Sequence, residues 1–216
     1  EGDRPAGFPA RRLARPDARG PALIAHPGLR EERMDERAAK RRVLILGGGF
    51  GGAYVARELE KRLRGESDVE VVLVARENFV LFTPMLHEVA GGDVEVTDIV
   101  QPLRKMLRHT RVVIADVEAI DLPKQQVRIA HGDLPPYEIQ YDQLVLALGA
   151  VTNFYRTPGL EEHALTMKTL GDAILVRNRV IDALELADNQ ADEVARRTTL
   201  TIVVAGAGFA GVETVG

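Results

Sequence analysis

The chain has 216 residues, of which 45% are hydrophobic and 28% charged, as in an ordinary globular protein. Its formal net charge of −4 gives no nucleic-acid footprint, and its longest apolar runs fall short of the roughly 18 residues that a membrane-spanning helix needs. Cysteine is absent, which excludes a disulfide framework, a thiolate metal site and a redox thiol in this stretch.

The first 33 residues carry seven arginines, five prolines and no lysine, without sustained periodicity, and this composition predicts disorder. Met34 then precedes the first strand as an ordinary start would. A targeting peptide is the alternative, but no long apolar run is present. The acidic residues Asp3, Asp17, Glu31 and Glu32 also argue against a transit peptide. We therefore predict that residues 1–40 are a disordered or non-native tail.

A dinucleotide fingerprint follows the tail. The apolar residues 43–46 run straight into a G-x-G-x-x-G sequence formed by Gly47, Gly49 and Gly52. In this motif the first glycine permits a tight turn, the second lets the backbone approach a pyrophosphate, and the third lets the helix pack close to its strand. A helix over residues 52–63 and a nearly all-apolar strand over residues 69–74 then complete a predicted parallel βαβ unit.

The fingerprint also expects an acidic residue about 20 positions further on, where it binds a ribose. Ala75 occupies that position. Glu77, two residues later, is one candidate to bind the ribose in place of the missing carboxylate. Backbone groups or water are the other candidates. Arg76 between them is either a solvated side chain or a contact to the adenosine end of the ligand.

The middle of the chain combines short apolar runs with polar segments. Pro84 ends an apolar run over residues 79–86, and a polar helix is predicted around residues 99–107. A turn is predicted at residues 131–133. Four further strands are predicted, over residues 111–115, 117–120, 127–130 and 144–148. The last is predicted to be buried and leads into Gly149.

The last part of the chain repeats the opening pattern. A helix begins after Thr169, a plausible N-cap with Asp172 three residues later, and a polar connection follows over residues 188–197. A predicted strand over residues 199–205 then enters a second fingerprint, 159 residues after the first. Its glycines are Gly206, Gly208 and Gly211. Two such motifs indicate a protein that holds two dinucleotides and passes a hydride or electrons between them.

The predicted fold class is therefore α/β. Residues 41–150 are expected to form the N-terminal part of one Rossmann-like domain, and residues 151–216 a linker helix and the start of a second. Gly216 lies about one turn into the helix that follows Gly211, so we expect the chain to be a fragment.

From residue 42 onward the motifs resemble the pyridine-nucleotide:disulfide-oxidoreductase-like flavoproteins, and within them the type II NADH:quinone dehydrogenases. The resemblance rests on linked segments in the order of that family. They are the first fingerprint, residues 76–79 with 81–86, residues 141–150, Pro158-Gly159-Leu160, Lys168-Thr169, and the second fingerprint ending in Gly211-Val212-Glu213. Single motifs are shared by the whole superfamily. The Phe-x-Pro-Met-Leu segment, together with the Pro-Gly-Leu-Glu segment, narrows the resemblance to the type II enzymes.

The resemblance implies that the first fingerprint domain binds FAD and the second binds NADH. Implied FAD contacts are Gly47, Gly49, Phe50, Gly51 and Gly52 at the pyrophosphate, Arg76 and Glu77 at the adenosine end, Val117 at the adenine, and Thr83, Pro84, Ala147 and Gly149 near the flavin. Implied NADH contacts are Gly206, Gly208, Phe209, Ala210 and Gly211. The alternative for these glycines is that they serve only tight turns.

Glu213 is the one candidate catalytic residue. In the family the matching glutamate lies near the flavin, between the nicotinamide and quinone ends; the alternative is a carboxylate that only complements the helix N-terminus. His87 is predicted to pack and not to catalyse. The other histidines of the globular part are isolated, so no metal site is predicted.

The implied activity is hydride transfer from NADH to FAD, followed by reduction of a membrane quinone. The implied protein is a homodimer without nucleic-acid partners, cytoplasmic and peripheral on the inner face of the cell membrane. One alternative is a flavin-binding scaffold with weak NADH turnover, like apoptosis-inducing factor; another is a different pyridine-nucleotide-dependent flavoprotein reductase. A sulfide:quinone type of enzyme is disfavoured because its cysteines have no counterpart here.

Overall fold

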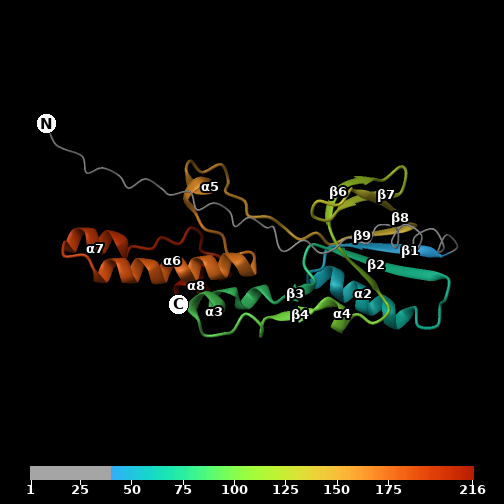
Figure 1. Ribbon diagram of the computed structural model, residues 1–216, viewed down its shortest axis with the longest axis horizontal. Helices are drawn as coiled ribbons and strands as arrows, with labels where there is room; N and C mark the ends of the chain where they lie inside the picture. Colours follow the sequence, from blue (N-terminus) through green and yellow to red (C-terminus); the bar gives the residue numbers. More distant parts are fainter. Residues whose placement is uncertain (1–39) are drawn as a thin grey trace. The chain divides into compact units, whose positions relative to one another are not determined.

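The computed structural model describes residues 40–216, so the predicted tail falls outside the described residues apart from Lys40. The described chain is built on a parallel four-stranded sheet in the order β5-β2-β1-β9 (Figure 1). Its strands are β1 (Arg41–Leu46), β2 (Val69–Ala75), β5 (Arg111–Ile114) and β9 (Gln143–Leu146). This architecture confirms the predicted α/β, Rossmann-like class.

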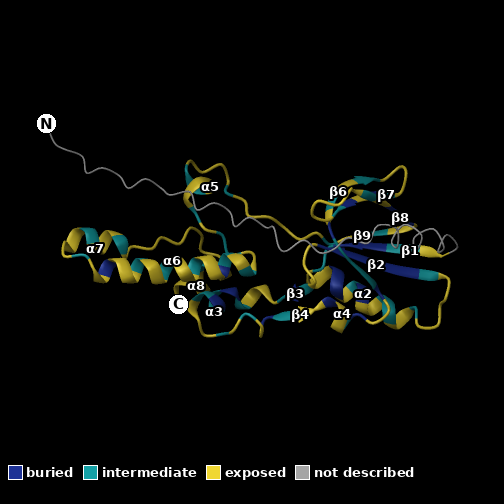
Figure 2. Ribbon diagram, viewed as in Figure 1, coloured by how far each residue is buried: buried dark blue, intermediate teal, exposed yellow. Residues whose placement is uncertain are grey.

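The predicted βαβ unit is present, with helix α2 (Phe50–Arg62) between the adjacent, parallel strands β1 and β2. Leu44 pairs with Val72 in this ladder, and both side chains are almost fully buried. Ala53 and Ala56 are also fully buried, and their small side chains let α2 lie close against the sheet. Figure 2 shows this core as the dark blue inner face of α2 and most of β2. Burial of such apolar side chains, about 1.5–3 kcal/mol for each Leu or Val, is what stabilises the unit.

A separate antiparallel sheet contains β6 (Asp116–Asp121), β7 (Gln126–Ala130) and β8 (Tyr137–Gln140). The first two strands and the turn at residues 131–133 agree with the sequence prediction. The third strand was not predicted, because only Ile139 of its four residues is buried and the apolar alternation is too short to detect.

The predicted helix around residues 99–107 is mostly wrong. Residues Val100–Pro102 form strand β4, which pairs antiparallel with β3 (Phe79–Leu81), and helix α4 is only Leu103–Met106. Pro102 explains the difference, because the residue before a proline is pushed away from helical geometry. Pro84 does not end regular structure as predicted. Strand β3 ends at Leu81, and Pro84 lies inside a 3₁₀ turn, η1 (Thr83–Met85), which leads into helix α3 (Leu86–Gly91), because proline is tolerated in the first turn of a helix.

Four helices follow β9: α5 (Leu160–His163), α6 (Leu170–Asp188), α7 (Glu193–Thr199) and α8 (Phe209–Val215). The predicted cap of α6 is confirmed, since the Thr169 hydroxyl accepts from the Asp172 amide and the Asp172 carboxylate accepts from the Thr169 amide. Residues 193–197 were predicted as part of a polar connection but are helical. The reason is a second cap, in which the Asp192 carboxylate accepts from the amides of Val194 and Ala195.

Two strand predictions near the C-terminal half are corrected. Residues 201–207 form no strand, and Thr199 ends α7 instead. Within residues 40–216 no neighbouring strand pairs with this segment, so its apolar pattern has no ladder to join. The strand predicted over residues 144–148 ends at Leu146, and Leu146 and Leu148 are more than half exposed, because β9 lies at the edge of the described sheet. No helix among residues 40–216 combines the length and apolar character needed to cross a bilayer.

Candidate dinucleotide sites

The first fingerprint turn is shaped by backbone atoms that leave no room for side chains. Gly47 has φ +111°, and its amide donates to the Val74 carbonyl at 2.8 Å. A Cβ on Gly47 would lie 2.1 Å from the Ala147 carbonyl oxygen, and a Cβ on Gly52 would lie 1.8 Å from the Gly47 carbonyl oxygen. Both positions therefore require glycine, as the motif predicts.

Gly49 is different, because a Cβ there would meet nothing within 4 Å. It is the N-cap of the 13-residue helix α2, with no side-chain cap and no acidic residue in the first turn. The Ala53 amide donates to the Gly49 carbonyl, which leaves the preceding amides without acceptors inside the helix. The open space around the Gly49 Cβ position and the positive end of the helix dipole fit a pyrophosphate, so the residues present fit a dinucleotide here.

The strand ends next to this turn bring further predicted residues together. Ala75 is buried, and a Cβ on Gly48 would lie 2.6 Å from its side chain and 3.8 Å from the Glu77 carbonyl oxygen. Arg76 and Glu77 are exposed and follow directly after the end of β2. The acidic position of the motif is thus filled by a methyl group that packs on the glycine turn.

The crossover after β9 approaches the same turn from the other side. The Ala147 amide donates to the Leu46 carbonyl at 2.8 Å, and the Ala147 methyl group lies 3.6 Å from a Cβ placed on Gly51. Gly149 has φ +75°, a conformation that glycine adopts without strain. Val117 lies in β6 opposite Ile129, just beyond the end of β5, the strand that pairs with β2.

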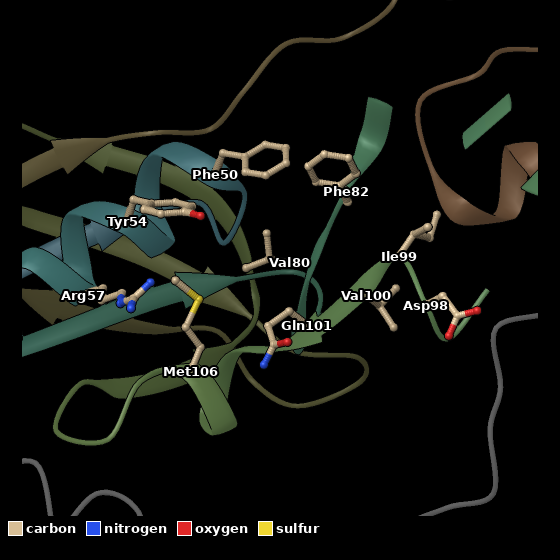
Figure 3. Close-up of a pocket in the computed structure, with 10 residues that line it drawn as sticks. All are labelled: Phe50, Tyr54, Arg57, Val80, Phe82, Asp98, Ile99, Val100, Gln101 and Met106. Carbon is tan, nitrogen blue, oxygen red and sulfur yellow. The ribbon is translucent and has the colours of Figure 1, made fainter. Parts of the chain in front are cut away.

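Thr83 and Pro84 open η1, and Phe82 connects them to the first turn of α2. The rings of Phe82 and Phe50 meet edge to face, with centroids 5.7 Å apart and planes at 81°. Figure 3 shows the two rings above a hollow of about 520 Å³, whose walls include Tyr54, Arg57 and Met106. Sequence reasoning missed Phe82, although its place directly before Thr83-Pro84 was the available signal.

The second fingerprint has the same local geometry. Gly206 has φ +124°, Gly208 caps α8 with φ −76° and ψ 175°, and a Cβ on Gly211 would lie 2.0 Å from the Gly206 carbonyl oxygen. Its surroundings differ, since Phe209 is 89% exposed and Ala210 is exposed as well. The turn is therefore formed, while the strand that should support it is not.

Glu213 lies in α8 and reaches helix α3. Its Oε2 atom is 3.6 Å from Nδ1 of His87, whose Nε2 atom is 3.7 Å from Oε1 of Glu88. His87, which the sequence suggested only packs, therefore faces the one predicted catalytic carboxylate. Within residues 40–216, no group of three or more histidine, aspartate or glutamate side chains is placed to hold a metal ion.

The family model for pyridine nucleotide-disulphide oxidoreductases matches residues 41–216. The chain belongs to this family. It is 36% identical over 180 residues to the type II NADH:quinone oxidoreductase NdhA of Mycobacterium tuberculosis, which covers 82% of this chain and 37% of that protein. It is 34% identical over 178 residues to the demethylphylloquinone reductase NdbB of Synechocystis, with 81% and 42% covered. The resemblance predicted from the motifs is thereby confirmed.

Solved structures agree with the fold. NDH2 of Plasmodium falciparum superposes with a TM-score of 0.74 at 24% identity, over 81% of this chain and 36% of that one. The sulfide:quinone oxidoreductase of Aquifex aeolicus superposes with a TM-score of 0.57 at 27% identity, over 69% and 33%. The chain spans well under half the length of the curated relatives and solved structures named here.

Proposed function

We propose that the full-length protein is a non-proton-pumping, FAD-dependent NADH:quinone oxidoreductase. The observation that carries the proposal is the pair of turns with one backbone geometry, each with a first glycine at positive φ, a second glycine with open space at its Cβ position, and a third with no room for a Cβ. The names of the relatives support this proposal, because NdhA is an NADH:quinone oxidoreductase and NdbB is a demethylphylloquinone reductase. Bound FAD would supply the redox chemistry by accepting a hydride and releasing electrons.

In this proposal the first turn binds FAD and the second turn binds NADH. The amides of Phe50, Gly51 and Gly52 would hold the FAD pyrophosphate, with residues 41–150 as the N-terminal part of the FAD domain. The η1 segment and residues 147–149 would border the flavin. Residues 206–211, at the start of the NADH domain, would receive the second dinucleotide, and Glu213 would lie where the two meet.

We also propose that the acceptor is a membrane quinone, and that the complete protein is a cytoplasmic homodimer, peripheral on the inner face of the membrane. The similarity to the solved sulfide:quinone oxidoreductase makes sulfide the competing electron donor. These 216 positions hold no cysteine for thiol-based sulfide chemistry, and the name of the relative NdhA supports NADH as the donor.

The test compares the full-length protein with residues 34–216. We expect the full-length protein to purify yellow with FAD and to oxidise NADH when a short-chain quinone is added, as followed by NADH absorbance. We expect no such activity from residues 34–216, because α8 has only seven residues to support its turn. Sulfide in place of NADH is the matched donor control. A flavin-free protein, or one that reduces quinone only with sulfide, would contradict the proposal.

A further inference from the structure

His87 is placed between two carboxylates from different helices. Nδ1 faces Glu213 of α8 at 3.6 Å, and Nε2 faces Glu88 of α3 at 3.7 Å. The imidazole is 22% exposed, while both carboxylates are roughly twice as accessible. Arg177 of α6 lies against the end of α3, with its guanidinium 3.7 Å from a Cβ placed on Gly92.

The chemistry of imidazole gives this arrangement a consequence. A neutral ring donates through only one nitrogen, whereas a protonated ring donates through both. At 3.6 and 3.7 Å the ring makes ion-pair contacts and not hydrogen bonds, so it attracts Glu88 and Glu213 together only while both of its nitrogens are protonated. When it gives up one proton, one carboxylate faces a lone pair, so proton transfer at one nitrogen changes the interaction at the other.

The proposed reaction needs a proton from water. NADH, one proton and a quinone give NAD⁺ and a quinol, because the hydride brings two electrons and one proton while the quinol takes two protons. The second proton has to reach the reacting groups from solvent. Glu88 is open to solvent, and Glu213 lies in the first helix after the second fingerprint.

We propose that His87 is a positioning residue that holds Glu213 and exchanges its proton with water through Glu88. Starting from a neutral ring protonated at Nδ1, a proton taken up at Glu88 passes to Nε2, so that both nitrogens are protonated. The proton on Nδ1 then passes to Glu213, which leaves the ring neutral. His87 also lies two residues after Met85, the end of η1, so the contact connects the η1 segment to α8. This inference rests on the proposed function.

The kinetic test is a double-mutant cycle in the full-length protein with its flavin, using His87→Phe, Glu213→Gln and the pair. Flavin reduction by NADH and steady-state quinone reduction are measured separately. We expect His87→Phe to lower kcat with quinone about tenfold or more while KM for NADH stays unchanged. The pair should be no slower than Glu213→Gln alone. His109→Phe, at an exposed histidine, is the matched control and should behave as wild type.

His87→Gln separates the two parts of the role. Glutamine can donate to Glu213 but cannot exchange a proton at pH 7, so this variant should keep normal flavin reduction by NADH and still lose quinone turnover. Effects that multiply in the double variant, or a His87→Phe variant with wild-type kcat, would overturn the inference.

A second readout does not depend on enzymatic activity. These 216 residues contain no cysteine, so introduced thiols are the only ones among them. His87→Cys with Glu213→Cys is treated with dibromobimane, which becomes fluorescent when it bridges two nearby thiols. We expect bridging in this pair and none when Glu193→Cys, on exposed α7, replaces Glu213→Cys. Absence of bridging in the first pair refutes the contact. If the wild type has no NADH:quinone activity, the proposed function and the proton role both fail, while bridging still reports the contact.

Discussion

The two fingerprint turns have the same backbone but very different support. Gly47 and Gly206 share a positive φ, and Gly49 and Gly208 cap their helices with nearly identical angles. The first turn follows β1, which is paired on both sides by β2 and β9. The second follows residues 201–205, which join no sheet among the described residues and include Val203 at 84% exposure.

The comparison separates what the local sequence determines from what needs the rest of the fold. The glycine spacing alone is enough to produce the turn and the first turn of helix, because both close through contacts within six residues. The strand requires neighbours that satisfy its amides and cover its side chains. A dinucleotide site needs both, so we expect the two copies to respond differently to the same substitutions.

The largest expected difference is between Gly52→Ala and Gly211→Ala. The added methyl group meets a carbonyl oxygen at 1.8 Å in the first turn and 2.0 Å in the second. In the first copy α2 packs on the buried sheet and cannot move away, so we expect a loss of about 3 kcal/mol in the free energy of unfolding. In the second copy α8 is exposed and can shift, so the loss should stay below about 0.5 kcal/mol. Urea denaturation of residues 34–216 followed by circular dichroism measures both.

Gly171→Ala serves as the control for that experiment, because a Cβ there meets only the Thr169 hydroxyl at an ordinary 3.7 Å. It should leave the urea midpoint unchanged or raise it slightly. Equal losses for Gly52→Ala and Gly211→Ala would mean that the second turn is as firmly supported as the first.

A smaller effect on stability, but a large one on binding, is expected for Gly49→Val. The protein itself leaves open space at this Cβ, so the fold should tolerate the side chain. The valine would occupy the space assigned to the pyrophosphate, and we expect at least about a hundredfold weaker FAD binding, roughly 2.7 kcal/mol. Flavin absorbance after reconstitution of the full-length protein, together with its circular dichroism spectrum, checks both statements.

Gly208→Val is the corresponding change in the second copy. It should leave the flavin content of the full-length protein intact and raise the KM for NADH, because the two turns are proposed to hold different ligands. If Gly208→Val also released the flavin, the assignment of the two sites would have to be abandoned.

The sequence predicted those parts of the fold whose signals are local or strongly apolar. Three predictions of this kind are confirmed: the strand before Gly47, the strand over residues 69–74 and the helix cap at Thr169. Each is determined by residues within the segment itself. The helix predicted around residues 99–107 is wrong because Pro102 disfavours helical geometry at the residue before it, and residues 100–102 form strand β4. The strand predicted over residues 199–205 is absent. An apolar run favours burial, but it forms a strand only where a neighbouring strand can pair with it.

In the candidate site, too, the local features were predictable from the sequence and the contacts between distant segments were not. The glycines that must be glycine follow from the motif, and their close approaches to Ala147 and Gly47 agree with it. Contacts between distant segments were not visible. Phe82 meets Phe50 across 32 positions and His87 meets Glu213 across 126, and no spacing rule brings such pairs together. Residues that act through tertiary packing require the structure.

The smallest predicted effect concerns Glu60, which secures the first copy's helix to the segment that leads into β5. Its carboxylate accepts from the amides of Arg108, His109 and Thr110 at 3.3, 2.8 and 2.7 Å. Partial burial by itself raises the pKa of Glu60, but these backbone donors outweigh it and hold the pKa below its ordinary value of 4.5.

A lowered pKa in the folded state means that the charged carboxylate stabilises the fold above pH 4.5, and that this contribution is lost as the pH falls through the folded-state pKa. Glu60→Gln should therefore cost about 1 kcal/mol or less at pH 7, because the side chain is largely solvent-screened, and nothing once wild-type Glu60 is protonated. Urea midpoints of residues 34–216 between pH 3 and pH 7 measure this convergence. The control Glu66→Gln, at an exposed turn, should run parallel to wild type throughout. A Glu60→Gln deficit that persists unchanged at the lowest pH would show that packing, and not the carboxylate charge, connects α2 to this segment.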